Sequence, residues 1–203
     1  MTTPGPPWSN AAATAPQRWL NKGQSQRGRL LRRLLPWLLV AAAVHLLAVW
    51  ALPRVIMWRL SAVATPQERA SVYLPPMTDH TQRRVVMPSP DLLYATCALN
   101  LAERPMRIRA DLRTPGYSSI ALYASNSDNY FVLNDRQAGG APVDLVVLGP
   151  QAYAQAPALP PGARTVTAPS AKGLLLMRVL VADYQAEKEV VEAARRTLRC
   201  EPL

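Results

Sequence analysis

Acidic residues are missing from the first third of this chain. Between Met1 and Gln67 there is no Asp or Glu, although that stretch holds eight of the 23 Lys and Arg residues. All 13 acidic residues lie beyond it, so the rest of the chain is close to neutral. A nucleic-acid-binding domain needs cationic residues clustered on its folded surface. The net charge of +10 therefore belongs to the N-terminal region and does not indicate a nucleic-acid-binding protein.

Residue types that carry catalysis or bind metals are also scarce. Apart from His45 the chain has one histidine, His80, and it contains no G-x-S-x-G nucleophile motif. His80, Cys97 and Cys200 lack the spacing of metal ligands. We therefore expect no metal and no cofactor. This scarcity favours a non-catalytic protein over an enzyme without deciding between them.

What the sequence does contain is one long apolar run, from Leu34 to Leu52, in which His45 is the single polar side chain. As a helix, this run rises about 28 Å, close to the ~30 Å hydrocarbon thickness of a bilayer. Six Lys or Arg residues precede it, and the more positive flank of a span normally stays in the cytoplasm. This predicts a single-pass anchor with a cytoplasmic N-terminus and the C-terminal domain on the far side of the membrane. In a Gram-negative bacterium that means an inner-membrane anchor and a periplasmic domain.

A cleaved signal peptide is the alternative to a retained anchor. Ala62-Val63-Ala64 resembles a small-residue cleavage site. However, the apolar run is longer than the ~7–15 residues of a typical signal, and Arg54 and Arg59 lie between the run and that site. The sequence therefore favours a retained signal anchor.

One face of the predicted span carries small residues around its histidine. Ala41, His45 and Ala48 follow a spacing of four and three residues, which places them on the same side of a helix. Small residues let a second helix approach closely, and a polar side chain there often finds a partner. We expect this face to contact another membrane helix; a neutral histidine facing lipid is the alternative.

The chain divides into four predicted segments. They are a disordered cytoplasmic tail (1–29), the transmembrane anchor with its flanks (30–60), a connector (61–82) and a β-rich periplasmic domain (83–203). Strands are predicted at 92–101, 106–110, 117–124, 130–133, 143–148 and 174–181. Asp183 is expected to cap a helix running to about Arg199, with Glu192 and Arg196 as an ion pair. The fold class is therefore mainly β: a sandwich-like or partly closed antiparallel sheet with a C-terminal α-helix.

Cys97 and Cys200 are the only two cysteines. If the domain is periplasmic, its oxidising surroundings allow them to pair. Such a bond would close a loop of about 100 residues, worth about 4–5 kcal/mol in the chain-entropy model. Two separate buried thiols are the alternative.

The stretch RVVMPSPDLLYATCALNLAERP, which begins at Arg84, resembles the opening motif of a bacterial domain-of-unknown-function family, number twelve fifty-four. Within it Pro88, Asp91, Leu93 and Tyr94 match, whereas Asn100 stands where aspartate is usual. The resemblance covers roughly residues 70–203. Short, singly anchored members of this kind look like the predicted integral membrane proteins of proteobacteria. It implies a β-rich periplasmic domain and a partner: a second small membrane protein that carries the companion domain, twelve fourteen by name.

Arg84, Asp91 and Tyr94 form the polar group of greatest interest. They are expected either to stabilise the fold as a network at the start of a strand or to line the wall of a ligand pocket. The polar loop Ser125–Asn129 is expected to be a turn rather than a cation site. The sequence thus predicts a membrane-anchored periplasmic binding or interaction protein. The alternative is a periplasmic small-ligand sensor or enzyme with a pocket near Arg84, Asp91 and Tyr94.

Overall fold

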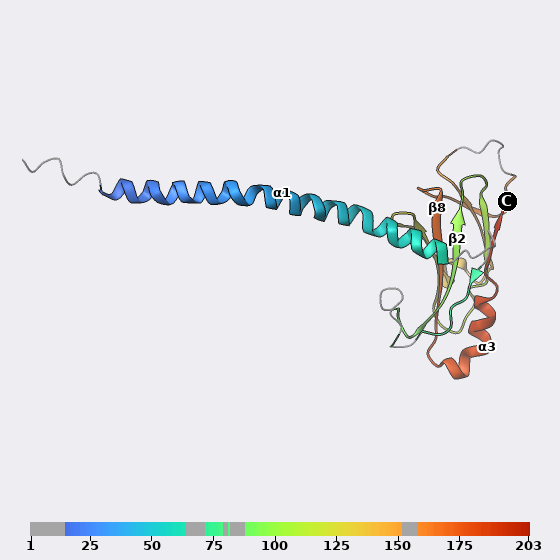
Figure 1. Ribbon diagram of the computed structural model, residues 1–203. Helices are drawn as coiled ribbons and strands as arrows, with labels where there is room; N and C mark the ends of the chain where they lie inside the picture. The colour runs from blue at the N-terminus through green and yellow to red at the C-terminus, as the bar shows by residue number, and fades with distance from the viewer. Residues whose placement is uncertain (1–14, 64–71, 79–80, 82–87, 152–157) are drawn as a thin grey trace, which may run out of the picture. The chain divides into compact units, whose positions relative to one another are not determined.

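The computed structural model describes residues 15–63, 72–78, 81, 88–151 and 158–203. It divides the chain into two compact units, Met1–Ala51 and Leu52–Leu203. The first unit consists of most of a long helix, and the second holds the end of that helix and all the strands (Figure 1). His80 and Arg84 lie outside the described residues.

Helix α1 (Ala15–Val63) contains the predicted apolar run and is longer than it at both ends. It begins inside the segment 1–29 and continues past Pro53, because Met57 and Leu60 pack onto a sheet beyond that proline. The part from Leu30 to Ser61 has a mean hydropathy of 2.1, and none of its most apolar 18 residues is buried. Within the described chain, this is the one helix long and apolar enough to cross a membrane.

The second unit is built on two sheets. The five-stranded sheet is antiparallel throughout and contains, in spatial order, β1 (Val72–Tyr73), β2 (Leu92–Asn100), β8 (Lys172–Leu180), β4 (Ser118–Ala124) and β5 (Asn129–Asn134). The four-stranded sheet contains β7 (Arg164–Thr167), β6 (Val143–Leu148), β3 (Met106–Ala110) and β9 (Arg199–Pro202). Its β6–β7 pair is parallel and its other pairs are antiparallel.

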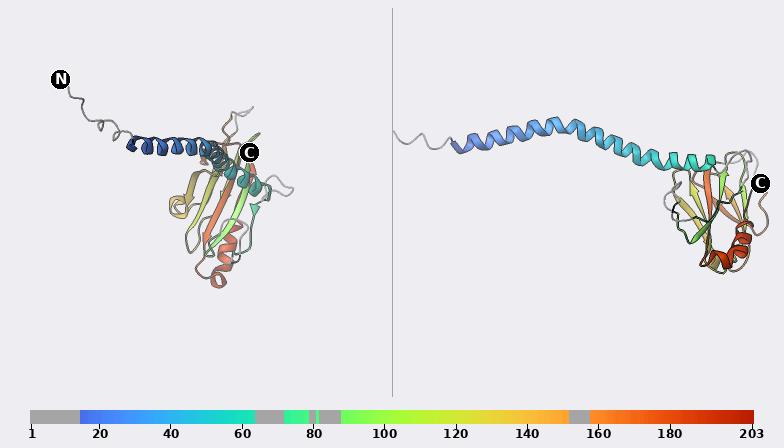
Figure 2. Two further views of the ribbon diagram at one scale, coloured as in Figure 1. Left: turned by 60° about the vertical axis from the view of Figure 1, so that its left-hand side comes forward. Right: turned by 60° about the horizontal axis from the view of Figure 1, so that its bottom comes forward.

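Alternating burial along the strands shows where the core lies. In β2, Leu93, Ala95, Cys97 and Leu99 are buried and the residues between them are half-buried. Strand β3 buries every second residue in the same way, with Arg107 and Arg109 on its other face. Because the apolar faces of both sheets belong to one buried cluster, they form a sandwich with a shared core (Figure 2).

Helix α3 (Tyr184–Arg195) packs at one end of this sandwich (Figure 2). Asp183 caps it as predicted, its carboxylate accepting from the N–H groups of Gln185 and Ala186 at 2.9 and 3.2 Å. The helix ends four residues earlier than predicted, and Arg199 begins strand β9 instead. A four-residue helix, α2 (Asp135–Ala138), follows β5 with an Asn134–Gln137 capping box.

The predicted mainly β fold with an N-terminal apolar helix and a C-terminal helix is confirmed. The six predicted strands are all present. Strands β1, β7 and β9 were missed because they are short edge strands of two to four residues. The four-stranded sheet departs from the predicted antiparallel arrangement, since β7 pairs with β6 in parallel.

Candidate functional site

The structure separates two members of the predicted polar group. Asp91 has an exposed side chain in the turn before β2, whereas Tyr94 is half-buried on the outer face of the five-stranded sheet. The Tyr94 hydroxyl accepts a hydrogen bond from the Ser89 N–H at 3.1 Å. The side-chain partner described for Tyr94 is therefore the backbone of the preceding segment rather than Asp91.

A buried arginine, Arg195, takes the structural role that was expected of that group. Its Nη2 lies 2.6 Å from Glu192 Oε2, and the two side chains are only 5% and 13% exposed. Its Nη1 donates to the Tyr94 carbonyl at 3.0 Å and to the Pro75 carbonyl. Arg195 thereby ties α3 to β2 and to the segment that follows β1.

This network corrects the expected pairing of Glu192 with Arg196. Glu192 binds Arg195, three residues on, because Arg195 lies with Val191 and Ala194 on the buried face of α3. The spacing of four residues from Val191 to Arg195 was the available signal for an arginine on the apolar stripe. Tyr184 donates to Glu192 Oε1 at 3.2 Å, and burial together with that carboxylate raises the pKa of the Tyr184 hydroxyl.

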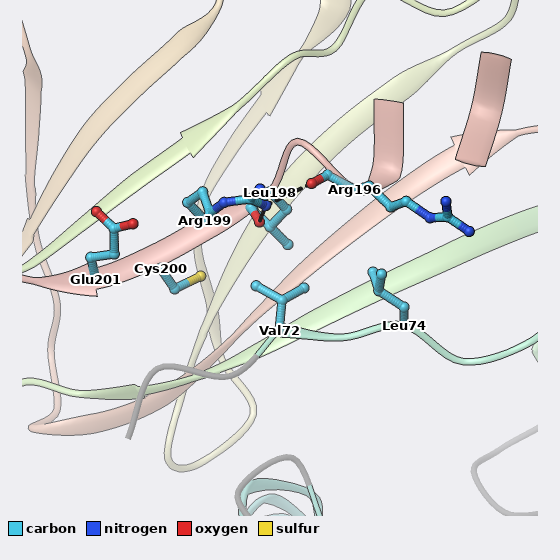
Figure 3. A pocket seen from close by; sticks show the side chains of 7 residues that line it. All are labelled: Val72, Leu74, Arg196, Leu198, Arg199, Cys200 and Glu201. Atoms are coloured by element: carbon cyan, nitrogen blue, oxygen red, sulfur yellow. Dashed lines mark hydrogen bonds between the residues drawn. The ribbon is translucent and has the colours of Figure 1, made fainter. Parts of the chain in front are cut away.

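A groove of about 430 Å³ lies between the edges of the two sheets. Val72 and Leu74 face Leu198, Arg199 and Cys200 across it (Figure 3). The Arg199 guanidinium donates to the carbonyls of Arg196 and Leu198 at 2.6 and 3.0 Å, which holds it along the groove wall. The groove is open and lined by both apolar and charged residues, and neither Asp91 nor Tyr94 is among them.

Cys97 and Cys200 are joined in a disulfide beneath this groove. Cys97 is in β2 of one sheet and Cys200 in β9 of the other, with their Cα atoms 6.6 Å apart. Both residues are buried. The bond therefore connects the two sheets through their shared core.

The outer face of the four-stranded sheet is covered by paired charges. Arg107 binds both oxygens of Asp144, at 2.8 and 2.6 Å, and Arg109 lies 2.7 Å from Glu201. The bidentate hydrogen bond from Arg107 holds the pKa of the Asp144 carboxyl below its ordinary value. This surface satisfies its own charges and is typical of a face in contact with water.

The outer face of the five-stranded sheet is different, since the end of α1 covers part of it. Met57 is buried against Leu174, with Leu60, Ala98 and Tyr123 packed around them. The Ser127 hydroxyl also lies 3.4 Å from the Pro53 carbonyl. The last turns of α1 are thus part of the domain.

The remaining predicted residues are placed as follows. Ala41, His45 and Ala48 lie on α1 with exposed side chains, and their contact with a second helix stays a prediction. The loop Ser125–Asn129 is a turn closed by its own Asn126–Asp128 hydrogen bonds, with Ser127 at φ 73°. In the described part of the chain no cluster of three or more His, Cys, Asp or Glu is arranged to hold a metal ion.

A two-sheet β-sandwich with a flanking helix can carry many unrelated functions, so the fold alone does not define the family of this chain. Residues 69–202 match the family described as "Protein of unknown function (DUF1254)". Because the match covers more than half of the sequence, the chain belongs to this family, as its opening motif suggests. No curated protein matches the sequence.

Two solved structures are similar to this one. The VPA0106 protein from Vibrio parahaemolyticus shares 13% identity at a TM-score of 0.50, over 57% of this chain and 28% of its own. An uncharacterized protein from Burkholderia cenocepacia shares 16% identity at a TM-score of 0.44, over 79% of this chain and 42% of its own. The first likeness supports the fold alone. This chain spans less than half the length of either solved chain.

Proposed function

We propose that this protein is a membrane-anchored interaction subunit of the bacterial inner membrane, displaying its β-sandwich in the periplasm. The observation that carries the proposal is the apolar part of α1, Leu30–Ser61, whose most apolar window has no buried residue. A long apolar helix without a protein partner is unusual in a soluble protein, whereas the hydrocarbon core of a bilayer would bury its apolar side chains.

The charge distribution supports a cytoplasmic N-terminus. The N-terminal flank of the apolar run is rich in Lys and Arg and free of acidic residues. The Cys97–Cys200 disulfide supports a periplasmic domain, because disulfides persist in oxidising compartments. These two arguments are independent and agree on one topology.

The partner proposed for this subunit is a second small membrane protein carrying the companion domain, twelve fourteen by name. The Ala41, His45 and Ala48 face supports it, because this face is suited to close helix packing within a bilayer.

The test is co-purification of the tagged full-length protein and the co-expressed companion protein in a mild detergent. We expect a stoichiometric complex that His45→Leu combined with Ala48→Leu disrupts. Ala43→Leu is the matched control. It adds the same bulk as Ala48→Leu, but at a position about 200° around the helix from His45, and should leave the complex intact. A complex that survives the double substitution would contradict the helix contact, and a protein that purifies alone would contradict the subunit assignment.

Topology needs a separate measurement. Intact mass of the purified protein should correspond to a chain retaining the segment before Ala64, and protease added to spheroplasts should digest the domain. A mature chain that begins after Ala64 would show a cleaved signal instead of an anchor. Protection of the domain in intact spheroplasts would contradict the periplasmic placement.

A further inference from the structure

Four polar side chains form a single row across the outer face of the five-stranded sheet. Tyr94 in β2 is paired in register with Arg178 in β8, Arg178 with Ser119 in β4, and Ser119 with Asn134 in β5. We call these four residues the donor row. Adjacent strands lie about 4.7–4.9 Å apart, so the row is roughly 14 Å long.

Alternation along each strand places the row opposite the core. Arg178 lies between the buried Met177 and Val179, and Ser119 precedes the buried Ile120. Because successive side chains point to opposite faces of a sheet, all four members of the donor row belong to the outer face. The row is two residues along each strand from Leu176 and Ala121, which are apolar neighbours on the same face.

Two members of the row have a buried donor without an acceptor among the described residues. Ser119 is 0% exposed, and its Oγ has no hydrogen-bond partner in the described part of the chain. The same is true of the buried Arg178 Nε. The Tyr94 hydroxyl accepts from Ser89 and the Asn134 side-chain oxygen accepts from Gln137, which leaves the Tyr94 O–H and the Asn134 NH₂ as donors without a described acceptor.

The unpaired Ser119 hydroxyl and Arg178 Nε are unusual because buried polar groups in folded proteins are nearly always paired. A guanidinium is the most demanding of them, since it carries a charge and five N–H donors in a fixed plane. The arginines of the four-stranded sheet show the ordinary arrangement, with Arg107 on Asp144 and Arg109 on Glu201. What the donor row lacks is a negatively charged acceptor.

We propose that the donor row is an oxyanion-binding site, in which Arg178 pairs with a carboxylate or phosphate group of a ligand. The hydroxyl of Tyr94 and the amide of Asn134 donate to the ligand from either side, and Ser119 supplies a donor at the floor of the site. The apolar neighbours Leu176 and Ala121 lower the local dielectric and strengthen the ion pair. A carboxylate or phosphate fits because both accept paired hydrogen bonds from a guanidinium.

The test uses the full-length protein in a neutral detergent, with inorganic phosphate and succinate as separate probes at constant ionic strength. We expect a saturable rise of the thermal unfolding midpoint with at least one probe, and the probe that produces it identifies phosphate or carboxylate as the group recognised. Arg178→Gln should weaken the apparent affinity at least about tenfold, as expected when a charged hydrogen-bonding partner is lost. Arg109→Gln, on the other sheet, is the control and should leave the rise unchanged.

Absence of a saturable rise with both probes would overturn the proposal, as would an equal rise in Arg178→Gln. Ser119→Ala provides a second test that does not depend on the folding of the Arg178 variant. Removing an unpaired hydroxyl should leave the midpoint without anion equal or higher, and should reduce the anion-dependent rise. A lower midpoint without anion, together with an unchanged rise, would show that the hydroxyl has a structural role and would contradict the site.

Discussion

The outer faces of the two sheets differ in whether their arginines have carboxylate partners. On the four-stranded sheet, Arg107 and Arg109 each have a carboxylate within 2.7 Å, supplied by the neighbouring strands. On the five-stranded sheet, the described residues supply Arg178 with no ion pair, and its Nε is buried without a partner among them. A face that completes its own ion pairs is typical of a surface in contact with water, whereas we propose that the donor row binds an anion from outside the domain.

Removing the Cys97–Cys200 disulfide, which connects the two sheets, should have the largest effect on the free energy of unfolding. Replacing both Cys97 and Cys200 with alanine should lower the free energy of unfolding by about 4–5 kcal/mol, because it frees a loop of about 100 residues in the unfolded chain. Urea denaturation of the full-length protein in detergent measures the loss. Wild type treated with reductant should lose a similar amount, and a midpoint unaffected by both treatments would contradict a structural disulfide.

Replacing the buried Arg195 should lower the free energy of unfolding far more than replacing the exposed Arg109. Arg195→Met leaves the Glu192 carboxylate unpaired in a largely buried position, for which we expect a loss of about 3–5 kcal/mol. Arg109→Met removes an exposed ion pair and should cost about 1 kcal/mol or less. Denaturation of the two variants side by side gives the comparison directly. Equal losses would mean that Arg195 is not the link between α3 and β2.

The helix end that covers the five-stranded sheet provides a smaller test. Met57 is 5% exposed, and Met57→Ala should lower the free energy of unfolding of the domain by about 2 kcal/mol. Val55 is 45% exposed on the same helix, so Val55→Ala is the control and should change it little. If the two variants behave alike, the last turns of α1 do not contribute to the stability of the sandwich.

The smallest expected effect is the contribution of the Arg107–Asp144 pair to stability at low pH. The Arg107 hydrogen bond lowers the pKa of Asp144 below the ordinary 3.8, so the folded protein binds this proton less readily than the unfolded chain does. The stabilisation is complete above about pH 5 and is lost as the pH falls through the lowered pKa. Unfolding midpoints between pH 7 and pH 3 should therefore fall less steeply for Asp144→Asn than for wild type. Identical slopes would show that the pair contributes nothing to acid stability.

Much of the fold could be predicted from the sequence, because its signals are local. The 19-residue apolar run indicates the helix, and alternation in Met106–Ala110 indicates a strand with one wet face. Asp183 marks the start of α3 for an equally local reason. Short edge strands carry no such pattern, and Pro202 in β9 argues against a strand until the edge position is known.

The candidate site could not be predicted in the same way. Arg178 appears in the sequence as one polar residue within a dense apolar strand, and Ser119 as an unremarkable serine. Their proximity depends on β8 lying between β2 and β4, an order that no local pattern specifies. Tyr94 was selected from the motif around it, but its neighbours on the sheet come from strands about 25 to 85 residues away.

The pairing of β3 with the C-terminal β9 also delays the completion of the four-stranded sheet during synthesis. Strand β3 receives its edge partner only when β9 has been made, since Ile108 pairs with Cys200. At about 5–20 residues per second, the roughly 90 intervening residues take about 5–20 seconds to emerge. During that interval the edge of β3 is open to pairing with other chains. A nascent chain of this protein is therefore exposed to aggregation for longer than one whose neighbouring strands are synthesised in succession. A chaperone that covers the edge of β3 would have its greatest effect during that interval.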